Sequence, residues 1–271
     1  MENTAIRLPQ PKPFSEAKSQ KVEFYLKDFL PLPKTKVTML SGAGGLGKSF
    51  LAIQLAIRMI REKNDRKVLL WLSEDTAGES RERANQILTK VMGYSIEDAN
   101  SMLRNIDIIG SDAEELTPYI NDNSLTPLKK FFSPYSLVVL DPLIAFFDGD
   151  ENSNPQARRF VSVLTAISTV NLQSILLIHH HGKKDSEGNS SMRGASAFRD
   201  AIRVHYEMRY NEKGSNPIIH LEKDNVFAKQ YLKEKDFSLK ILPYEVVIEE
   251  SVGEVENIGL EEKKPSIWSK I

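Results

Sequence analysis

The stretch that decides the fold is SGAGGLGKS, residues 41–49, which contains the pattern G-x-x-x-x-G-K-S. It follows the apolar run KVTML (36–40), which is typical of a short buried strand, and precedes FLAIQLAIRMIREK (50–63), whose apolar spacing predicts a helix. Strand, glycine-rich loop and helix in this order form the context in which the pattern binds the phosphates of a nucleotide. A chance match in a glycine-rich turn is the alternative, and the flanking elements disfavour it.

The chemistry of this loop depends on its backbone and on two side chains. Glycines let successive N–H groups converge on phosphate oxygens, and the helix N-terminus adds partial positive charge. We expect Lys48 to reach the β- and γ-phosphates and the Ser49 hydroxyl to ligate Mg²⁺. The predicted cofactor-binding residues of the loop and its helix start are Gly42, Ala43, Gly44, Gly45, Leu46, Gly47, Lys48, Ser49 and Phe50.

Strands and helices alternate along most of the chain. The further strand candidates are VLLWLS (68–73), IDIIG (106–110), SLVVLDPL (136–143) and SILLIHH (174–180). Such alternation predicts βαβ units, and therefore an α/β fold with a mostly parallel central sheet flanked by helices. After about residue 203 come only short strand candidates separated by turn residues. We therefore expect antiparallel strands at the C-terminal end of the sheet.

Composition excludes several classes of protein. The chain has 271 residues and a formal net charge of −1, which disfavours a broad basic face that coats DNA, so any nucleic-acid contact must be local. It has no cysteine, which excludes disulfides, thiolate catalysis and cysteine-ligated metal sites. No apolar stretch approaches the ~20 residues that cross a bilayer, and the N-terminus lacks a signal-peptide core. We expect a cytoplasmic protein without membrane contact.

The chain divides into three parts by composition. Residues 1–22 are polar and proline-containing, and they are expected to form an arm that can grip a neighbouring subunit. Residues 23–250 form the predicted nucleotide-binding domain. Residues 251–271 are interpreted as an acidic, solvated tail.

Acidic residues follow two of the predicted strands. Asp141 ends SLVVLD, where it can support the metal ion; an ordinary acidic turn residue is the alternative. VLLWLSED ends in Glu74 and Asp75. Because the carboxyl ends of parallel strands gather at the ligand edge, we favour Glu74 as the base that activates water and Asp75 as a helix cap. The alternative is that both only cap the following helix.

Three consecutive histidines, His179, His180 and His181, stand at the end of the strand candidate SILLIHH. Side chains alternate between the faces of a strand, so His179 and His180 cannot both face one phosphate, and a shared metal site is disfavoured. A histidine within hydrogen-bonding reach of the γ-phosphate can instead sense hydrolysis and pass it to the polar loop that follows. A polar strand end without a function is the alternative.

The segments SGAGGLGKS, WLSED, SLVVLDPL, IHHHGK and SMRGASAFRDAIR resemble RecA-type ATPases in their order and spacing. They are similar to the RepA-like branch of hexameric replicative helicases of plasmids and phages. The resemblance covers roughly residues 28–230. It implies a RecA-like fold and a ring, usually of six subunits, with ATP between neighbours and single-stranded DNA in the central hole.

The resemblance also implies roles for individual residues. His180 matches the usual sensor position, and His179 is its neighbour. Arg83 falls where the family places an arginine against the adenine; a solvated helix face is the alternative. The remaining implied residues are Lys48 and Ser49 for triphosphate and Mg²⁺, Asp141 for the metal and Glu74 for water.

A ring ATPase needs a cation that one subunit supplies to the γ-phosphate of the next. RGASAFRDAIR offers Arg193, Arg199 and Arg203, and the RepA-like pattern favours Arg203, whereas surface salt bridges are the alternative for all three. In related helicases a lysine-x-arginine pair also serves the neighbouring site. This chain has Lys223 and Asn225 at these positions. Asn225 carries no positive charge, which puts its contribution to the neighbouring site in doubt and leaves Arg203 as the candidate cation.

Contact with DNA is implied by the resemblance more than by residues. Lys183 and Lys184 in the histidine loop are the best candidates for contact with the DNA backbone. Phe146 and Phe147 are interpreted as core residues rather than as a platform for bases.

The preferred hypothesis is an ATP-hydrolysing ring motor that translocates on single-stranded DNA and unwinds duplexes in replication. A replication initiator or a primase is a candidate partner. The alternative is a non-motor RecA-like ATPase whose nucleotide state regulates DNA or protein binding. A small-molecule kinase is disfavoured because no acceptor-binding motif is evident.

Overall fold

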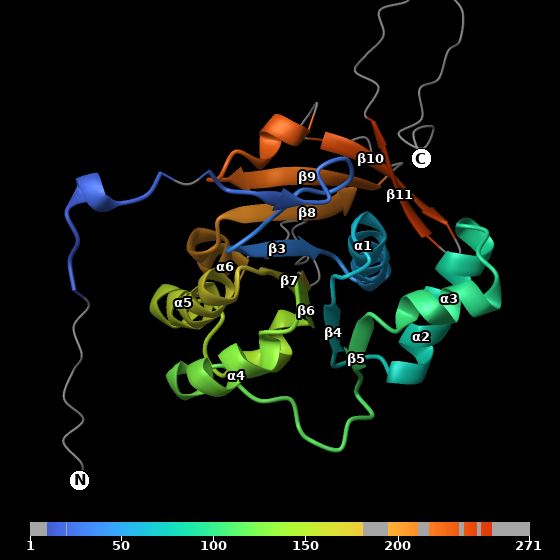
Figure 1. Cartoon of the computed structure of the whole chain (residues 1–271), viewed down its shortest axis with the longest axis horizontal. Helices are drawn as coiled ribbons and strands as arrows, with labels where there is room; N and C mark the ends of the chain where they lie inside the picture. Colours follow the sequence, from blue (N-terminus) through green and yellow to red (C-terminus); the bar gives the residue numbers. More distant parts are fainter. Residues whose placement is uncertain are drawn as a thin grey trace, which may run out of the picture.

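The computed structural model describes residues 10–19, 21–180, 195–210, 217–232, 236–242 and 245–250 (Figure 1). Within this part of the chain the main sheet has nine strands in the order β11-β10-β9-β8-β3-β7-β6-β4-β5. They are β3 (Val37–Gly42), β4 (Val68–Leu72), β5 (Ile106–Ile109), β6 (Leu137–Asp141), β7 (Ser174–His180), β8 (Val204–Tyr210), β9 (Pro217–Asp224), β10 (Asp236–Leu242) and β11 (Glu245–Glu250).

Strand direction confirms the expected fold class. The neighbours from β8 to β5 are all parallel, whereas β9, β10 and β11 are antiparallel to the strands they pair with. The parallel part extends one strand further than the short C-terminal strand candidates suggested. β8, the first of them, pairs parallel with β3 because α6 returns the chain to the starting edge of the sheet.

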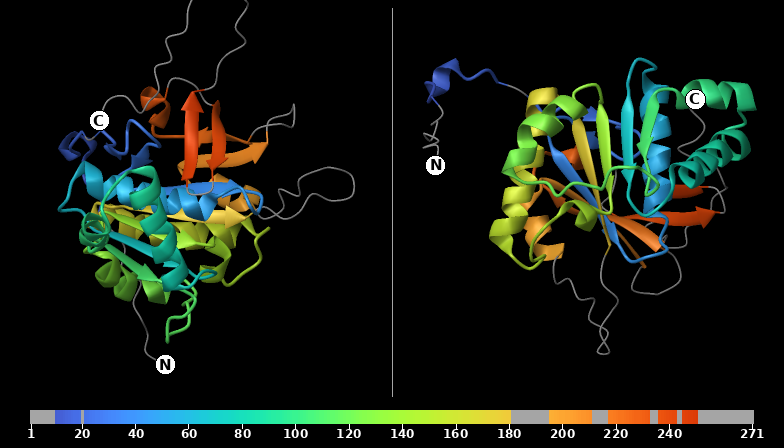
Figure 2. Two further views of the ribbon diagram at one scale, coloured as in Figure 1. Left: turned by 90° about the vertical axis from the view of Figure 1, so that its right-hand side faces the viewer. Right: turned by 90° about the horizontal axis from the view of Figure 1, so that it is seen from below.

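Helices cover both faces of the sheet, as Figure 2 shows. Apart from short 3-10 and π segments, the described helices are α1 (Lys48–Glu62), α2 (Ala77–Gln86), α3 (Ile96–Leu103), α4 (Leu125–Phe132), α5 (Asn154–Asn171) and α6 (Ala195–Ala201). α1, α2 and α3 lie on one face, and α4, α5 and α6 on the other. None of these helices combines the length and the apolarity that crossing a membrane requires.

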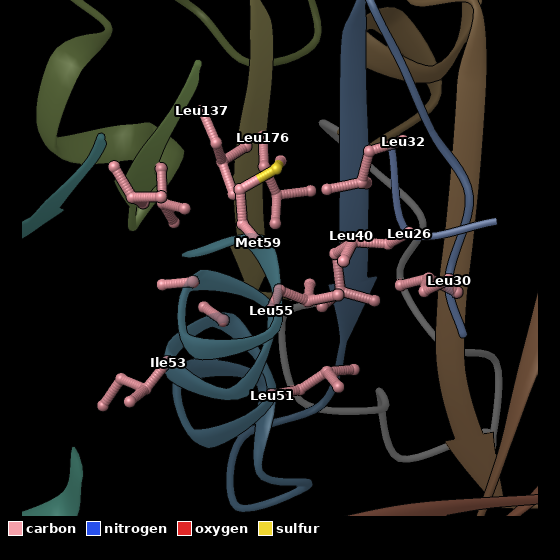
Figure 3. Close-up of a cluster of buried hydrophobic side chains, with 14 of the residues drawn as sticks. Leu26, Leu30, Leu32, Leu40, Leu51, Ile53, Leu55, Met59, Leu137 and Leu176 are labelled. Atoms are coloured by element: carbon pink, nitrogen blue, oxygen red, sulfur yellow. The ribbon is translucent and has the colours of Figure 1, made fainter. Parts of the chain in front are cut away.

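The two faces bury separate apolar clusters because strand side chains alternate between them. In β7, Leu176 and Ile178 belong to the α1 face, whereas Ile175 and Leu177 belong to the α5 face. Figure 3 shows the α1 face, where Leu51, Leu55 and Met59 of the helix pack toward the strands. This packing anchors α1 and therefore the loop that leads into it.

A short two-stranded sheet, β1 (Phe24–Tyr25) and β2 (Leu32–Pro33), ties the N-terminal part to the domain. The Tyr206 hydroxyl donates to the Pro31 carbonyl over 2.9 Å, and the Arg66 guanidinium lies 4.7 Å from the Tyr25 ring centroid. Residues 10–19 are exposed. Residues 251–271, the predicted acidic tail, lie outside the described residues.

Candidate nucleotide-binding site

Glycines shape the phosphate loop at the carboxyl end of β3. Gly45 and Gly47 have φ values of +78° and +80°, in the left-handed region that glycine tolerates. A Cβ on Gly42 would lie 2.4 Å from the Met208 carbonyl oxygen, so β8 approaches the root of the loop too closely for any side chain. α1 begins directly after Gly47, at Lys48, and the N-terminal end of this fifteen-residue helix faces the loop.

Lys48 is held over the loop and is buried. Its Nζ donates to the carbonyl oxygens of Gly42 at 2.9 Å and Ala43 at 2.7 Å. Burial lowers the pKa of Lys48 to about 8, although the negative charges of Asp141 and Glu74 oppose this shift. Triphosphate oxygens are stronger acceptors than these carbonyls, so a bound nucleotide can take over the ammonium group and restore its pKa.

Strand order brings the histidine strand between the phosphate loop and Asp141. β7 pairs with β3 on one side and β6 on the other, and Gly42 pairs in register with His180. His180 Nε2 lies 3.5 Å from Asp141 Oδ1. Both atoms are buried and neither has a hydrogen-bond partner, which is costly unless a further group joins them. A γ-phosphate or its metal-bound water fits this need.

The residues present fit Mg²⁺. Asp141 is 4% exposed at the end of β6, and Ser49 is half-buried in the first turn of α1. Carboxylate and hydroxyl oxygens beside substrate phosphates are the ligands that Mg²⁺ takes in nucleotide sites. Asp141 Oδ1 is buried and has no hydrogen-bond partner, so it is available to such an ion.

The turn that carries Glu74 is fastened to β6. The Ser73 N–H donates to the Asp141 carbonyl over 2.7 Å, which holds the start of the turn beside the metal-site residue. Glu74 is exposed and close enough to attract the Lys48 ammonium. This position suits a base that meets solvent on one side and the phosphate loop on the other.

The prediction that Asp75 caps α2 is wrong. Thr76 is the cap: its hydroxyl accepts from the Glu79 N–H, and the Glu79 carboxylate accepts from the Thr76 N–H, a reciprocal capping box. Asp75 instead forms an ion pair with Arg83 through both carboxylate oxygens.

Arg83 is half-buried and is not a freely solvated helix residue. Besides Asp75 it contacts Phe50, with its guanidinium carbon 5.7 Å from the ring centroid. Phe50 follows Ser49 in α1, so this contact joins α2 to the phosphate-loop helix. Arg83 therefore lies beside the helix that follows the phosphate loop. Its guanidinium can stack on a base either while it remains paired with Asp75 or after that ion pair breaks.

His179 and His180 diverge as predicted. His179 is buried, and its ring centroid lies 5.9 Å from that of Phe198 in α6. It packs on the α5 face, while His180 turns toward Asp141. His181, the third of the histidines, lies outside the described residues.

A family model described as AAA domain matches residues 5–186. The chain belongs to the AAA-domain family. It is therefore a P-loop ATPase. No curated protein matches the chain.

Arg203, which follows the residues that the family model matches, is distant from the chain's own phosphate loop. It directly precedes Val204, the first residue of β8, whereas the loop follows the last residue of the parallel strand β3. Arg203 is exposed, and its carbonyl accepts from the Asn225 N–H over 2.9 Å. The two residues thus lie together at the amino-terminal ends of the parallel strands, opposite to the phosphate loop.

Two more cations lie beside Arg203. Lys223 Nζ donates to the carbonyls of Arg199 and Asp200, at 2.8 Å and 3.0 Å. The Arg199 side chain lies 3.5 Å from a Glu222 carboxylate oxygen, as the salt-bridge alternative for this arginine predicted. Arg203 forms no ion pair within the described residues.

The remaining sequence predictions divide by location. Phe146 and Phe147 are buried, which confirms that they are core residues. Lys183, Lys184 and Arg193 lie outside the described residues, so their proposed roles stay predictions.

Sequence reasoning missed one buried polar pair at the root of the loop. Ser41 Oγ lies 2.6 Å from His205 Nε2, and both residues are buried. The partners are 164 residues apart in the chain; Ser41 directly precedes the G-x-x-x-x-G-K-S pattern, whereas His205 stands in no motif. Only the parallel pairing of β3 with β8 brings them together.

Proposed function

We propose that the chain is the subunit of a ring-shaped ATPase that translocates on single-stranded DNA and separates duplexes, in the manner of RepA-like helicases. The observation that carries the proposal is that two cationic residues of the chain lie at opposite ends of the parallel strands. Lys48 lies at the phosphate loop, while Arg203 lies at the opposite edge. Transfer of a phosphoryl group needs additional positive charge in the transition state, and a second copy can supply it through Arg203.

The chain's own residues divide the work of hydrolysis. Glu74 accepts the proton of the attacking water, and Lys48 binds the β- and γ-phosphates. Ser49 and Asp141 would hold Mg²⁺, which neutralises charge on the phosphates when bound. His180, paired with Gly42 in register and 3.5 Å from Asp141, changes its contacts when the γ-phosphate leaves.

The step from ATPase to motor depends on the segment that comes directly after β7. His180 is the last residue of β7, and we propose that a change in its contacts affects residues 181–194, which follow it in the chain. Lys183 and Lys184 in that segment are proposed to contact the DNA backbone. Movement of this segment with each hydrolysis cycle would then pull the strand through the ring.

Two measurements test the proposal. Native mass spectrometry with and without a non-hydrolysable ATP analogue should detect a closed oligomer, expected to be a hexamer. ATP-dependent separation of a forked duplex should accompany stimulation of hydrolysis by single-stranded DNA, and Lys48→Ala is the control that removes both. DNA-independent hydrolysis without strand separation would contradict the motor and favour the regulatory ATPase. A monomer that turns over ATP at full speed would contradict the ring.

A further inference from the structure

A cavity of about 280 Å³ lies under α2, away from the phosphate loop. Figure 1 shows α2 and α3 beside β5, the edge strand of the sheet. The apolar lining comes from α1, β4, α2, α3 and β5 and includes Ile53, Leu70, Ala84, Leu103, Ile106 and Ile108. Ile106 and Ile108 are only partly buried, so this part of the core remains open rather than filled by the chain's own side chains.

One polar side chain in this lining lacks a partner. Ser80 of α2 is 2% exposed, and its Oγ forms no hydrogen bond. A buried hydroxyl without a partner loses its hydration and gains nothing in return. A ligand that fills the cavity can therefore gain one hydrogen bond from Ser80 in addition to apolar contact.

A hydrogen bond joins α2 to α3 beside the cavity. Arg81 lines the cavity, and its Nη2 donates to Asn100 Oδ1 of α3 over 2.9 Å. This contact ties α2 to α3 and disfavours entry of a polypeptide segment. An apolar cavity of ~150 Å³ already accommodates benzene, so the larger volume here accommodates one or two aromatic rings.

From these observations we infer that the cavity is a binding site for a small aromatic molecule that carries one hydrogen-bonding group. The rings would contact the isoleucine and leucine side chains, and the polar group would pair with Ser80. Phenol and indole have this chemistry.

The site borders the catalytic turn. Ala77 and Gly78, in the first turn of α2, line the cavity and follow the turn that carries Glu74. The Ala77 N–H donates to Asp112 Oδ1 over 2.9 Å, so this end of the helix is also held from the loop after β5. A ligand that restrains the first turn of α2 is expected to change the rate of ATP turnover.

Phenol and toluene are matched probes because they have similar size and differ by one hydroxyl. We expect phenol to bind the full chain more tightly than toluene. Ser80→Ala should weaken phenol by about two- to tenfold and leave toluene unchanged or improved. The variant should fold, since it removes a hydroxyl without a partner. Titration calorimetry or ligand-observed NMR gives these affinities.

Ala84→Met is the second variant, because an unbranched thioether can extend into the cavity and fill it. It should abolish binding of both probes and remove the effect of phenol on ATP turnover. Equal phenol affinity in the wild-type chain and both variants would overturn the site. Phenol binding that depends on Ser80 but leaves turnover unchanged would overturn its link to catalysis. Neither outcome depends on DNA or on a ring, so the proposed helicase function stands or falls separately.

Discussion

The two ends of the parallel strands differ in what their charged side chains contact. At the carboxyl ends, Lys48, Asp141 and His180 converge on one space. At the starting ends, Lys223 lies on backbone carbonyls beside Arg203. Burial lowers the pKa of Lys223, Asp200 opposes the shift, and the arginines nearby, Arg203 among them, lower it further. Positive charge thus accumulates where this chain has no phosphate loop.

Under the proposed ring, this difference would leave each chain with only part of a catalytic site. A site that binds triphosphate gains from cations that arrive with a neighbour, because hydrolysis then depends on assembly. The exposed surface around Arg203 is positively charged, as a neighbour that approaches the triphosphate would have to be. Substitutions at each end of the sheet, and then at the contact that connects β3 to β8, test this comparison.

The largest effect is expected at the phosphate loop. Lys48→Ala should reduce ATP binding and hydrolysis below detection, because no other described side chain donates in place of the ammonium group at Gly42 and Ala43. Titration with a fluorescent ATP analogue measures the binding, and circular dichroism checks the fold. Retained affinity within about threefold of wild type would contradict the assignment.

Arg203→Ala should separate binding from turnover. We expect hydrolysis to fall by about 10³-fold, as on loss of an arginine finger, while ATP affinity stays within about threefold. Steady-state hydrolysis and nucleotide titration measure the two quantities. Arg158→Ala, which removes another exposed arginine from the same region, is the matched control and should have little effect.

Mixing two inactive variants sharpens this test. Lys48→Ala subunits retain Arg203, and Arg203→Ala subunits retain a phosphate loop, so mixed oligomers would contain some complete sites if Arg203 acts across subunits. Partial recovery of hydrolysis is expected on mixing. Normal hydrolysis by Arg203→Ala alone would show that the arginine does not act across subunits.

The buried ammonium of Lys48 predicts a pH dependence of binding. Its pKa is about 8 without nucleotide, and bound triphosphate should raise it. ATP affinity should therefore fall by about tenfold between pH 7 and pH 9, with proton uptake on binding near pH 8. Calorimetry in two buffers of different ionisation enthalpy measures both. An unchanged affinity across this range would contradict the lowered pKa.

The lowered pKa of Lys48 also predicts how the free energy of unfolding changes with pH. The folded, nucleotide-free chain loses the Lys48 proton near pH 8, whereas the unfolded chain keeps it up to about the ordinary value of 10.5. The unfolded state therefore binds more protons between these values, and the contribution of Lys48 to the free energy of unfolding rises with pH there. Below pH 8 the buried charge is destabilising.

The smallest effect concerns the contact that joins β3 to β8. Ser41→Ala leaves His205 Nε2 without its 2.6 Å partner and should lower the free energy of unfolding by about 1–3 kcal/mol. Chemical denaturation measures this difference. Ser162→Ala is the control, since its hydroxyl is exposed and donates only to the Arg158 carbonyl. Equal effects of the two variants would exclude a special role for the buried pair.

Local patterns in the sequence predicted most of the parallel strands and the phosphate loop. They failed at the start of α2, where Asp75 was preferred as the cap although T-x-x-E at Thr76–Glu79 is the signature of a capping box. They also could not predict that β8 joins β3 in parallel, because strand direction depends on where α6 returns the chain. Polarity along a strand says which residues are buried but not which neighbour they meet.

What the sequence by itself determined is the phosphate loop, the alternation of strands and helices and the acidic strand ends, because each depends on residues that are close along the chain. Only the tertiary structure decided that His180 lies beside Asp141, that Ser41 meets His205 and that Arg203 lies at the opposite edge from Lys48. These relations depend on strand order. Strand order depends on how helices cover the two faces of the sheet, and no short stretch of sequence carries that information.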